Sequence, residues 1–238
     1  MSAAIAAPAA PAASAASAAS AASATEFAGR IATAAAWTFL GLLAVLHVAK
    51  PELDPSWRMV SEYAIGRHGW LMIVAFLSLS ASCLSAFVAV RPFVETRAGK
   101  IGLGFLVATG VSLAAAAVFV SDPITATKDQ LTTRGNLHGL SAMIGIPGFP
   151  IAAMLISRSL VRTRRRIEGR RALLAAAHLS WISVALMAAT IAATLPAAGG
   201  RFTADVPAGF PNRLLIVSYA VWVIVAARRV AQLRARGR

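Results

Sequence analysis

The sequence predicts an all-α polytopic membrane protein with six transmembrane helices. Of its 238 residues, 58% are hydrophobic and only 13% are charged. A soluble domain of this length is nearer half apolar and a quarter charged. The apolar residues also lie in long uninterrupted blocks, each reaching the roughly 18 residues that mark a membrane-spanning helix. The composition and the long apolar segments therefore indicate the same fold class.

Six apolar blocks give the expected helices in chain order. Between flanking charged residues, five blocks cover 31–49, 68–90, 101–121, 135–157 and 172–200. The sixth, 206–227, holds Arg213 near its start, where a long side chain can reach the membrane interface. We expect helices near 30–49, 69–90, 101–121, 136–157, 172–196 and 211–230.

The positive charges predict the orientation of these helices. The net charge is +14, and sixteen of the 23 Lys and Arg residues lie before span 1, between spans 2 and 3, between spans 4 and 5, and after span 6. Basic residues are retained on the cytoplasmic side, so we expect both termini inside the cell. The run RTRRRIEGRR (162–171) is then a topology anchor near anionic lipid, with regulatory lipid binding as the alternative. The partner implied by this charge is a lipid bilayer and not nucleic acid.

The chain divides into three expected parts. Residues 1–28 are rich in Ala, Ser and Pro and lack the basic start and apolar core of a secretory signal, so we expect a disordered tail. Residues 29–230 form the six-helix domain, and residues 231–238 form a basic cytoplasmic tail. The single cysteine, Cys83, offers no disulfide framework.

Polar residues gather where the helices meet the three outward loops. They occur in the segments LHVAKPELDP, VSEYAIGRHGWL, VSDP, GNLHG and GFPNR. Because all lie within a turn or so of one interfacial plane, we expect a polar layer over the outer mouth of the bundle. Its main members are His47, Ser61, Glu62, Tyr63, Asp122, His138, Asn212 and Arg213. The apolar neighbours of Glu62 indicate that its carboxylate faces inward.

The fourth span predicts a cavity beneath this layer. The segment GIPGFP (145–150) places two glycines and two prolines in the middle of a helix, where each proline deletes a hydrogen bond. Freed carbonyls inside a membrane must face protein or a water-filled space. Gly145 lies two turns below His138 on the same face, so a cavity can run from the polar layer to the kink. Close packing of small residues is the alternative.

Several kinds of chemistry suit the polar layer. His47, Asp122 and His138 could bind a catalytic metal, with zinc as the candidate, while Ser61 and Glu62 are the candidate catalytic residues and Glu62 the general base. Tyr63, Asn212 and Arg213 could instead hold a lipid or small anionic ligand. A single haem could use His47 and His138 as axial ligands. In the purely structural alternative, Asp122 and Glu62 pair with Arg213 or Arg134 and the histidines bond loop carbonyls.

The order of these segments across six spans resembles the bacterial membrane-protein family called domain of unknown function 998, over about residues 30–230. That resemblance implies a six-helix bundle in the bacterial cytoplasmic membrane and carries no activity. A looser similarity exists to alkaline ceramidases and adiponectin receptors, membrane metal hydrolases that use a Ser, an Asp and three His. The late His-x-x-x-His pair of that group is absent from this chain. We therefore expect a structural or ligand-binding membrane protein, with a metal-dependent hydrolase as the alternative and a single-haem redox protein third.

Overall fold

The computed structural model describes residues 10–163 and 169–235, and within them every regular element is helical. Six long helices are α1 (Ala10–Ala49), α2 (Gly69–Val90), α3 (Arg97–Val118), α4 (Thr133–Thr163), α5 (Arg170–Thr194) and α6 (Gly209–Ala235). Three short 3₁₀ helices are η1 (Val60–Ala64), η2 (Arg91–Phe93) and η3 (Lys128–Gln130). All six long helices are long and apolar enough to cross a membrane, which confirms the predicted fold class.

The helix boundaries follow local capping as well as hydropathy. The predicted second span, 69–90, matches α2. The third begins at Arg97, four residues before the predicted start, because the Thr96 hydroxyl caps it by accepting a hydrogen bond from the Gly99 amide at 3.0 Å. Charged residues in the first turn of a helix interrupt an apolar block without ending the helix.

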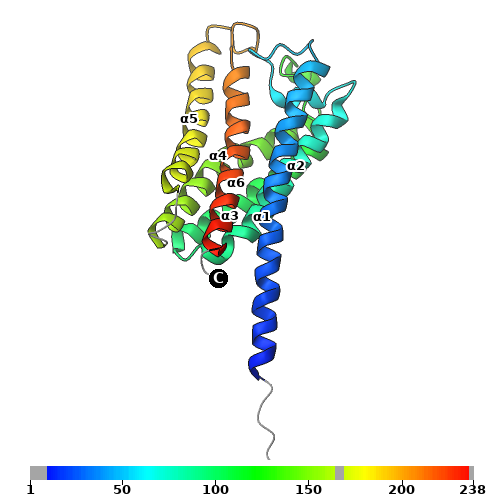
Figure 1. Cartoon of the computed structure of the whole chain (residues 1–238). Coiled ribbons are helices and arrows are strands. Elements are labelled where there is room, and N and C mark those ends of the chain that lie inside the picture. The colour runs from blue at the N-terminus through cyan, green and yellow to red at the C-terminus, as the bar shows by residue number, and fades with distance from the viewer. Residues whose placement is uncertain (1–9, 164–168, 236–238) are drawn as a thin grey trace, which may run out of the picture.

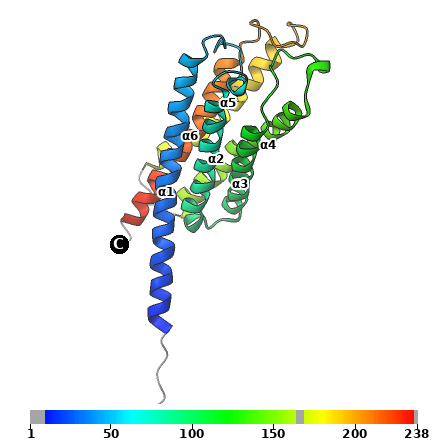
Figure 2. The ribbon, with the colours of Figure 1, turned by 90° about the vertical axis from the view of Figure 1, so that its right-hand side faces the viewer.

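The structure describes part of the segment 1–28, expected as a disordered tail, and places that part in a helix. Residues from Ala10 onward belong to α1, and residues 1–9 lie outside the described chain. Alanine has the highest helix propensity of all residues. An Ala/Ser repeat joined to a stable span extends a helix that is already nucleated. α1 consequently projects well beyond the bundle (Figures 1 and 2).

The helices pack with sequential neighbours in contact, and α1 and α6 also lie against each other (Figure 1). The segments 50–68, 119–132 and 195–208 gather at one end, which we call the loop end (Figures 1 and 2). The C-terminus and the turn between α2 and α3 lie at the opposite end, which we call the terminal end.

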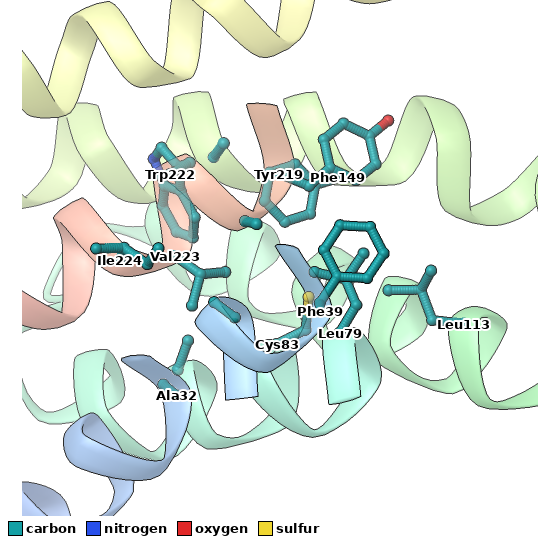
Figure 3. Close-up of a cluster of buried hydrophobic side chains, with 14 of the residues drawn as sticks. Ala32, Phe39, Leu79, Cys83, Leu113, Phe149, Tyr219, Trp222, Val223 and Ile224 are labelled. Carbon is teal, nitrogen blue, oxygen red and sulfur yellow. The ribbon is translucent and has the colours of Figure 1, made fainter. Parts of the chain in front are cut away.

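The core is a cluster of aromatic and aliphatic side chains from facing helices (Figure 3). Phe149 of α4 stacks on Tyr219 of α6 with ring centroids 3.9 Å apart and meets Trp222 edge-on at 5.6 Å. Phe39 and Leu79 bring α1 and α2 into the same cluster. Such offset and edge-to-face aromatic pairs fix helix orientation more tightly than aliphatic contacts do.

The kink-forming segment of α4 is stabilised by α6. Pro147 and Pro150 both lie inside α4. Because Pro150 has no N–H, the carbonyl of Ile146 four residues earlier loses its helical partner. The Tyr219 hydroxyl donates to that carbonyl at 2.5 Å. A side chain of α6 thus replaces the missing backbone hydrogen bond, as the apolar surroundings require.

Candidate functional site

Arg213, in the first turn of α6, is the hub of the loop end. Its Nε donates to His47 Nε2 at 2.7 Å, and its Nη2 donates to the Tyr63 hydroxyl at 2.9 Å. Its Nη1 donates to the carbonyls of Arg58 at 2.7 Å and Gly209 at 3.1 Å. The buried guanidinium therefore joins α1, η1 and the preceding segment to α6.

His47 is held as a neutral ring by this network. Its Nδ1 lies 2.7 Å from the Leu43 carbonyl, which can only accept, so Nδ1 carries the proton. Its Nε2 faces the Nε–H of Arg213, which can only donate, so Nε2 is unprotonated. Both ring nitrogens are committed. In this arrangement neither nitrogen of His47 is free for the metal or haem that the sequence suggested.

Glu62 faces inward, as predicted, and is 1% exposed. Its ion-pair partner differs from those expected: Arg58 pairs with Glu62 at 2.8 Å, in place of Arg213 or Arg134. The backbone amides of Met59 and Ile124 each donate to its carboxylate at 2.9 Å. Glu62 thereby fastens the segment 119–132 to η1. Three donors from two segments thus hold this carboxylate in place.

Asp122 holds a turn together and forms no ion pair with any residue that the structure describes. Its carboxylate accepts from the Thr132 amide at 2.8 Å and the Thr132 hydroxyl at 2.9 Å. A Cβ on Gly135 would lie 1.9 Å from Asp122 Oδ2, so glycine is needed for this close approach. Arg134 is exposed and makes no ion pair within the described chain, so the predicted pairing of Asp122 with Arg213 or Arg134 is wrong.

The start of α6 packs directly on the first outer segment. The Gly209 amide donates to the Ser56 carbonyl at 2.9 Å. A Cβ on Gly209 would lie 2.4 Å from the Pro55 carbonyl oxygen, so any larger residue would push the start of α6 away from the segment around Pro55. Asn212 extends this contact, because its Oδ1 accepts from the Val60 amide at 2.9 Å. Asn212 therefore sets the position of η1.

Two basic residues of the loop end are absent from the predicted set. Lys50 is 4% exposed, and its ammonium donates to the carbonyls of Tyr63 and Ile65. Arg58 pairs with Glu62 and supplies a carbonyl to Arg213. The four-residue spacing of Arg58 and Glu62 is the usual spacing of a helical ion pair and could have indicated their contact. No comparable signal marks Lys50.

His138 is buried at the start of α4 and has a different environment from His47. Its Nδ1 lies 2.8 Å from the Phe119 carbonyl and 3.2 Å from the Ala116 carbonyl at the end of α3. Nδ1 therefore carries a proton and serves two carbonyls that the helix end leaves free. Nε2 makes no hydrogen bond with any described residue. In the neutral ring, Nε2 is a free acceptor.

The predicted metal set does not assemble in the described residues. No group of three or more His, Cys, Asp and Glu side chains there could hold a metal ion. His47 is bound to Arg213, Asp122 to Thr132, and His138 to the end of α3. The polar layer is present at the loop end, but it is divided into an Arg213–Glu62 network and a separate His138 environment.

A cavity of about 100 Å³ lies beside His138, between α2, α3, α4, α6 and η1. It runs from η1 to the proline segment, which confirms the cavity expected from the sequence. Its apolar lining includes Phe76, Leu113, Ile146 and Ile216. Its polar lining consists of Ser61, Thr109, Ser112, His138, Ser141, Asn212 and Tyr219.

The polar groups of the cavity are hydroxyls, one amide and one imidazole. The hydroxyls of Thr109, Ser112 and Ser141 each donate to a carbonyl of their own helix at 2.8–2.9 Å, so these three oxygens can only accept a further hydrogen bond. The Ser61 hydroxyl makes no hydrogen bond within the described chain. No Lys, Arg, Asp or Glu lines the cavity, so Arg213 and Tyr63 stand outside it.

Six apolar helices and an ordered polar loop end define an integral, multi-pass membrane protein. The chain matches the family model described as protein of unknown function (DUF998) over residues 31–229. Because this match covers most of the chain, the protein belongs to that family. No curated protein and no solved structure matches the chain.

Proposed function

We propose that the protein binds a small neutral molecule, with one hydrogen-bond donor on an apolar body, in the cavity beside His138. The carrying observation is the free Nε2 of a buried histidine whose other nitrogen is fixed by Phe119 and Ala116. His138 lines the cavity, and a ligand that offers a donor can give this nitrogen the partner that the described residues do not supply. The ligand class follows from this acceptor and its apolar surroundings.

The cavity favours a neutral ligand over an anionic one. Its lining contains no cationic Lys or Arg side chain to offset the desolvation of an anion. Arg213 and Tyr63, considered for an anionic ligand, bond each other and sit outside the lining. Asn212 does line the cavity, but its Oδ1 is occupied by the Val60 amide. Its amide group can add only a donor to the site.

The lining also favours a donor on the ligand. His138 Nε2 accepts, and the hydroxyls of Thr109, Ser112 and Ser141 have already donated their protons to helix carbonyls. Four acceptors thus face one space. An alcohol can donate to His138 Nε2, whereas an ether of the same size can only accept, for example from the Ser61 hydroxyl or the Asn212 amide, and leaves Nε2 without a donor.

Two isomers of one formula, butan-1-ol and diethyl ether, test this proposal. We expect saturation-transfer NMR on protein in lipid nanodiscs to show binding of butan-1-ol about tenfold tighter than diethyl ether, equivalent to one hydrogen bond. His138→Leu should abolish that preference. Ala142→Leu, which fills the cavity from its wall, should weaken both ligands. Equal binding of the two isomers by the unaltered protein would contradict the proposal.

We further propose that the terminal end faces the cytoplasm of a bacterial cell. The support is the concentration of Lys and Arg at that end and of six of the nine acidic residues in the outer segments. The native cysteine, Cys83, is buried and gives a silent background for labelling. A membrane-impermeant maleimide added outside should label Thr127→Cys and not Arg97→Cys; the reverse pattern would overturn the orientation.

A further inference from the structure

A second space lies at the terminal end, between α1 and α6. It is a groove of about 560 Å³, within the range of about 300–1,000 Å³ usual for ligand pockets. One wall is formed by Thr25, Gly29, Thr33 and Ala34 of α1, and the other by Ala227, Val230 and Ala231 of α6. Because most of these side chains are small, two contacting helices leave room between them. Arg30 and Arg228 line the same groove.

We propose that this groove binds an anionic phospholipid of the bilayer, with the headgroup phosphate held by Arg30 and Arg228. Both arginines are exposed. Neither makes a hydrogen bond or ion pair with the rest of the described chain. Two free guanidiniums beside an apolar groove match a phosphate attached to acyl chains.

The depth of the groove fits a headgroup. Ala89, the residue before the last of α2, lines it with the two arginines. A Cβ on Gly29 would lie 3.8 Å from the Ala89 Cβ, so Arg30 stands level with the end of the apolar run of α2. That level is the membrane interface, where lipid phosphates lie.

Two threonine hydroxyls and one carboxylate also line the groove, and they are compatible with an anionic lipid there. Thr25 and Thr33 donate to the carbonyls of Ala21 and Gly29 at 2.9 and 3.0 Å. Their polar hydrogens are thus already satisfied, and the threonines add little polarity to the wall. Glu26 also lines the groove, but it has an interaction of its own and is not a free carboxylate. The lining carries more positive than negative charge.

Native mass spectrometry of the whole protein from nanodiscs of phosphatidylglycerol and phosphatidylcholine tests this site. We expect retention of phosphatidylglycerol in preference to phosphatidylcholine. Arg30→Gln with Arg228→Gln should weaken phosphatidylglycerol by about 30-fold, as expected for two arginines near an anionic surface. Arg97→Gln with Lys100→Gln removes the same charge from exposed positions at the same end and should change retention less than about twofold.

A second pair of variants separates lipid from free anion. Ala34→Leu with Ala231→Leu fills the groove from two exposed positions and keeps every charge, so it should also weaken phosphatidylglycerol while the melting temperature stays unchanged. Equal loss in the Arg97/Lys100 control would overturn the proposal, because attraction would then be general. Displacement of the lipid by millimolar inorganic phosphate, or full retention by the filled groove, would also overturn it.

Discussion

The Arg213–Glu62 network and the His138 cavity both begin at the loop end but differ in how their polar atoms are satisfied. In the Arg213–Glu62 network, all three guanidinium nitrogens of Arg213 and both carboxylate oxygens of Glu62 have partners, and Arg58 Nε is a buried atom without one. The lining of the His138 cavity holds no Lys, Arg, Asp or Glu, and His138 Nε2 and the Ser61 hydroxyl bond no described residue. The charged region therefore resembles a structural clamp, and the neutral region resembles a binding site.

This difference points to the neutral residues as the functional candidates, whereas residue type alone would point to the charged ones. Charged residues within membrane spans are functional candidates by default. Here the guanidinium of Arg213 already donates hydrogen bonds to His47, Tyr63 and two carbonyls. Capacity for a ligand remains where hydroxyls and one histidine lie around an empty volume. Satisfaction of hydrogen bonds separates the two roles better than charge does.

The largest expected effect comes from removing the hub of the charged region. Arg213→Met leaves His47 Nε2, the Tyr63 hydroxyl and two carbonyls without their donor. We expect a loss of about 3–5 kcal/mol in the free energy of unfolding, measured by SDS titration in mixed micelles. The matched control is Arg134→Met, which removes an exposed charge at the same end and should stay within about 0.5 kcal/mol. Comparable losses in both variants would mean that Arg213 is no clamp.

Glu62→Gln should have the next largest effect. The substitution keeps the side-chain size and leaves Arg58, whose side chain is 17% exposed, without its counter-charge. Because Arg58 retains some access to water, we expect about 2–3 kcal/mol, less than for a fully buried cation. Glu52→Gln is the control, since Glu52 is 64% exposed and lies 4.0 Å from Lys50, and it should cost about 0–1 kcal/mol. A Glu62→Gln protein as stable as the control would show that the segment 119–132 is held by other contacts.

The fold was predictable from the sequence where the signal is summed over many residues. Six spans follow from block lengths, and α2 was placed at its observed ends. The partners of Glu62 were not predictable in the same way. The Ile124 amide lies 62 positions away and reaches Glu62 only through the course of the segment 119–132. Long-range pairing of this kind depends on loop geometry, on which hydropathy carries no information.

The cavity was predictable because its cause is local. Two prolines and two glycines within six residues disturb one helix, and His138 precedes Gly145 by two turns on the same face. The Tyr219 hydroxyl bond to Ile146 was not predictable, because its donor comes from another helix 73 positions away. A disturbed backbone can thus be found in sequence, whereas the group that compensates for it cannot.

The hydrogen bond from Tyr219 to Ile146 gives a third prediction. Its expected effect on stability lies between those of Glu62→Gln and Asp54→Asn. Tyr219→Phe keeps the ring that stacks on Phe149 and leaves the Ile146 carbonyl without a donor, which should cost about 1–3 kcal/mol. In a Pro150→Ala background, a backbone N–H becomes available to Ile146. The same Tyr219→Phe change should then cost less, by about 1 kcal/mol in a double-mutant cycle. An additive cycle would contradict this account of the kink.

The smallest expected effect on stability concerns Asp54 in the first outer segment. Hydrogen bonds from the amide and hydroxyl of Ser56 lower the pKa of the Asp54 carboxyl below its ordinary value. A lowered folded-state pKa stabilises the fold above the unfolded-state pKa of about 3.9, and that stabilisation is lost as the pH falls through the folded-state pKa. We expect Asp54→Asn to flatten the pH dependence of the melting temperature slightly between pH 5 and pH 3. An unchanged profile would show that the Ser56 contacts do not form in solution.

The most direct test of the contrast between the Arg213–Glu62 network and the His138 cavity uses three proteins: wild type, Glu62→Gln and His138→Leu. The free energy of unfolding and the binding of butan-1-ol are measured on each. We predict a crossed result. Glu62→Gln should lose about 2–3 kcal/mol of stability and keep the preference for butan-1-ol over diethyl ether at a temperature where it is folded. His138→Leu should lose only about 1 kcal/mol and lose that preference entirely. Loss of the preference in the folded Glu62→Gln protein, or its survival in His138→Leu, would contradict the assignment of the cavity as the binding site.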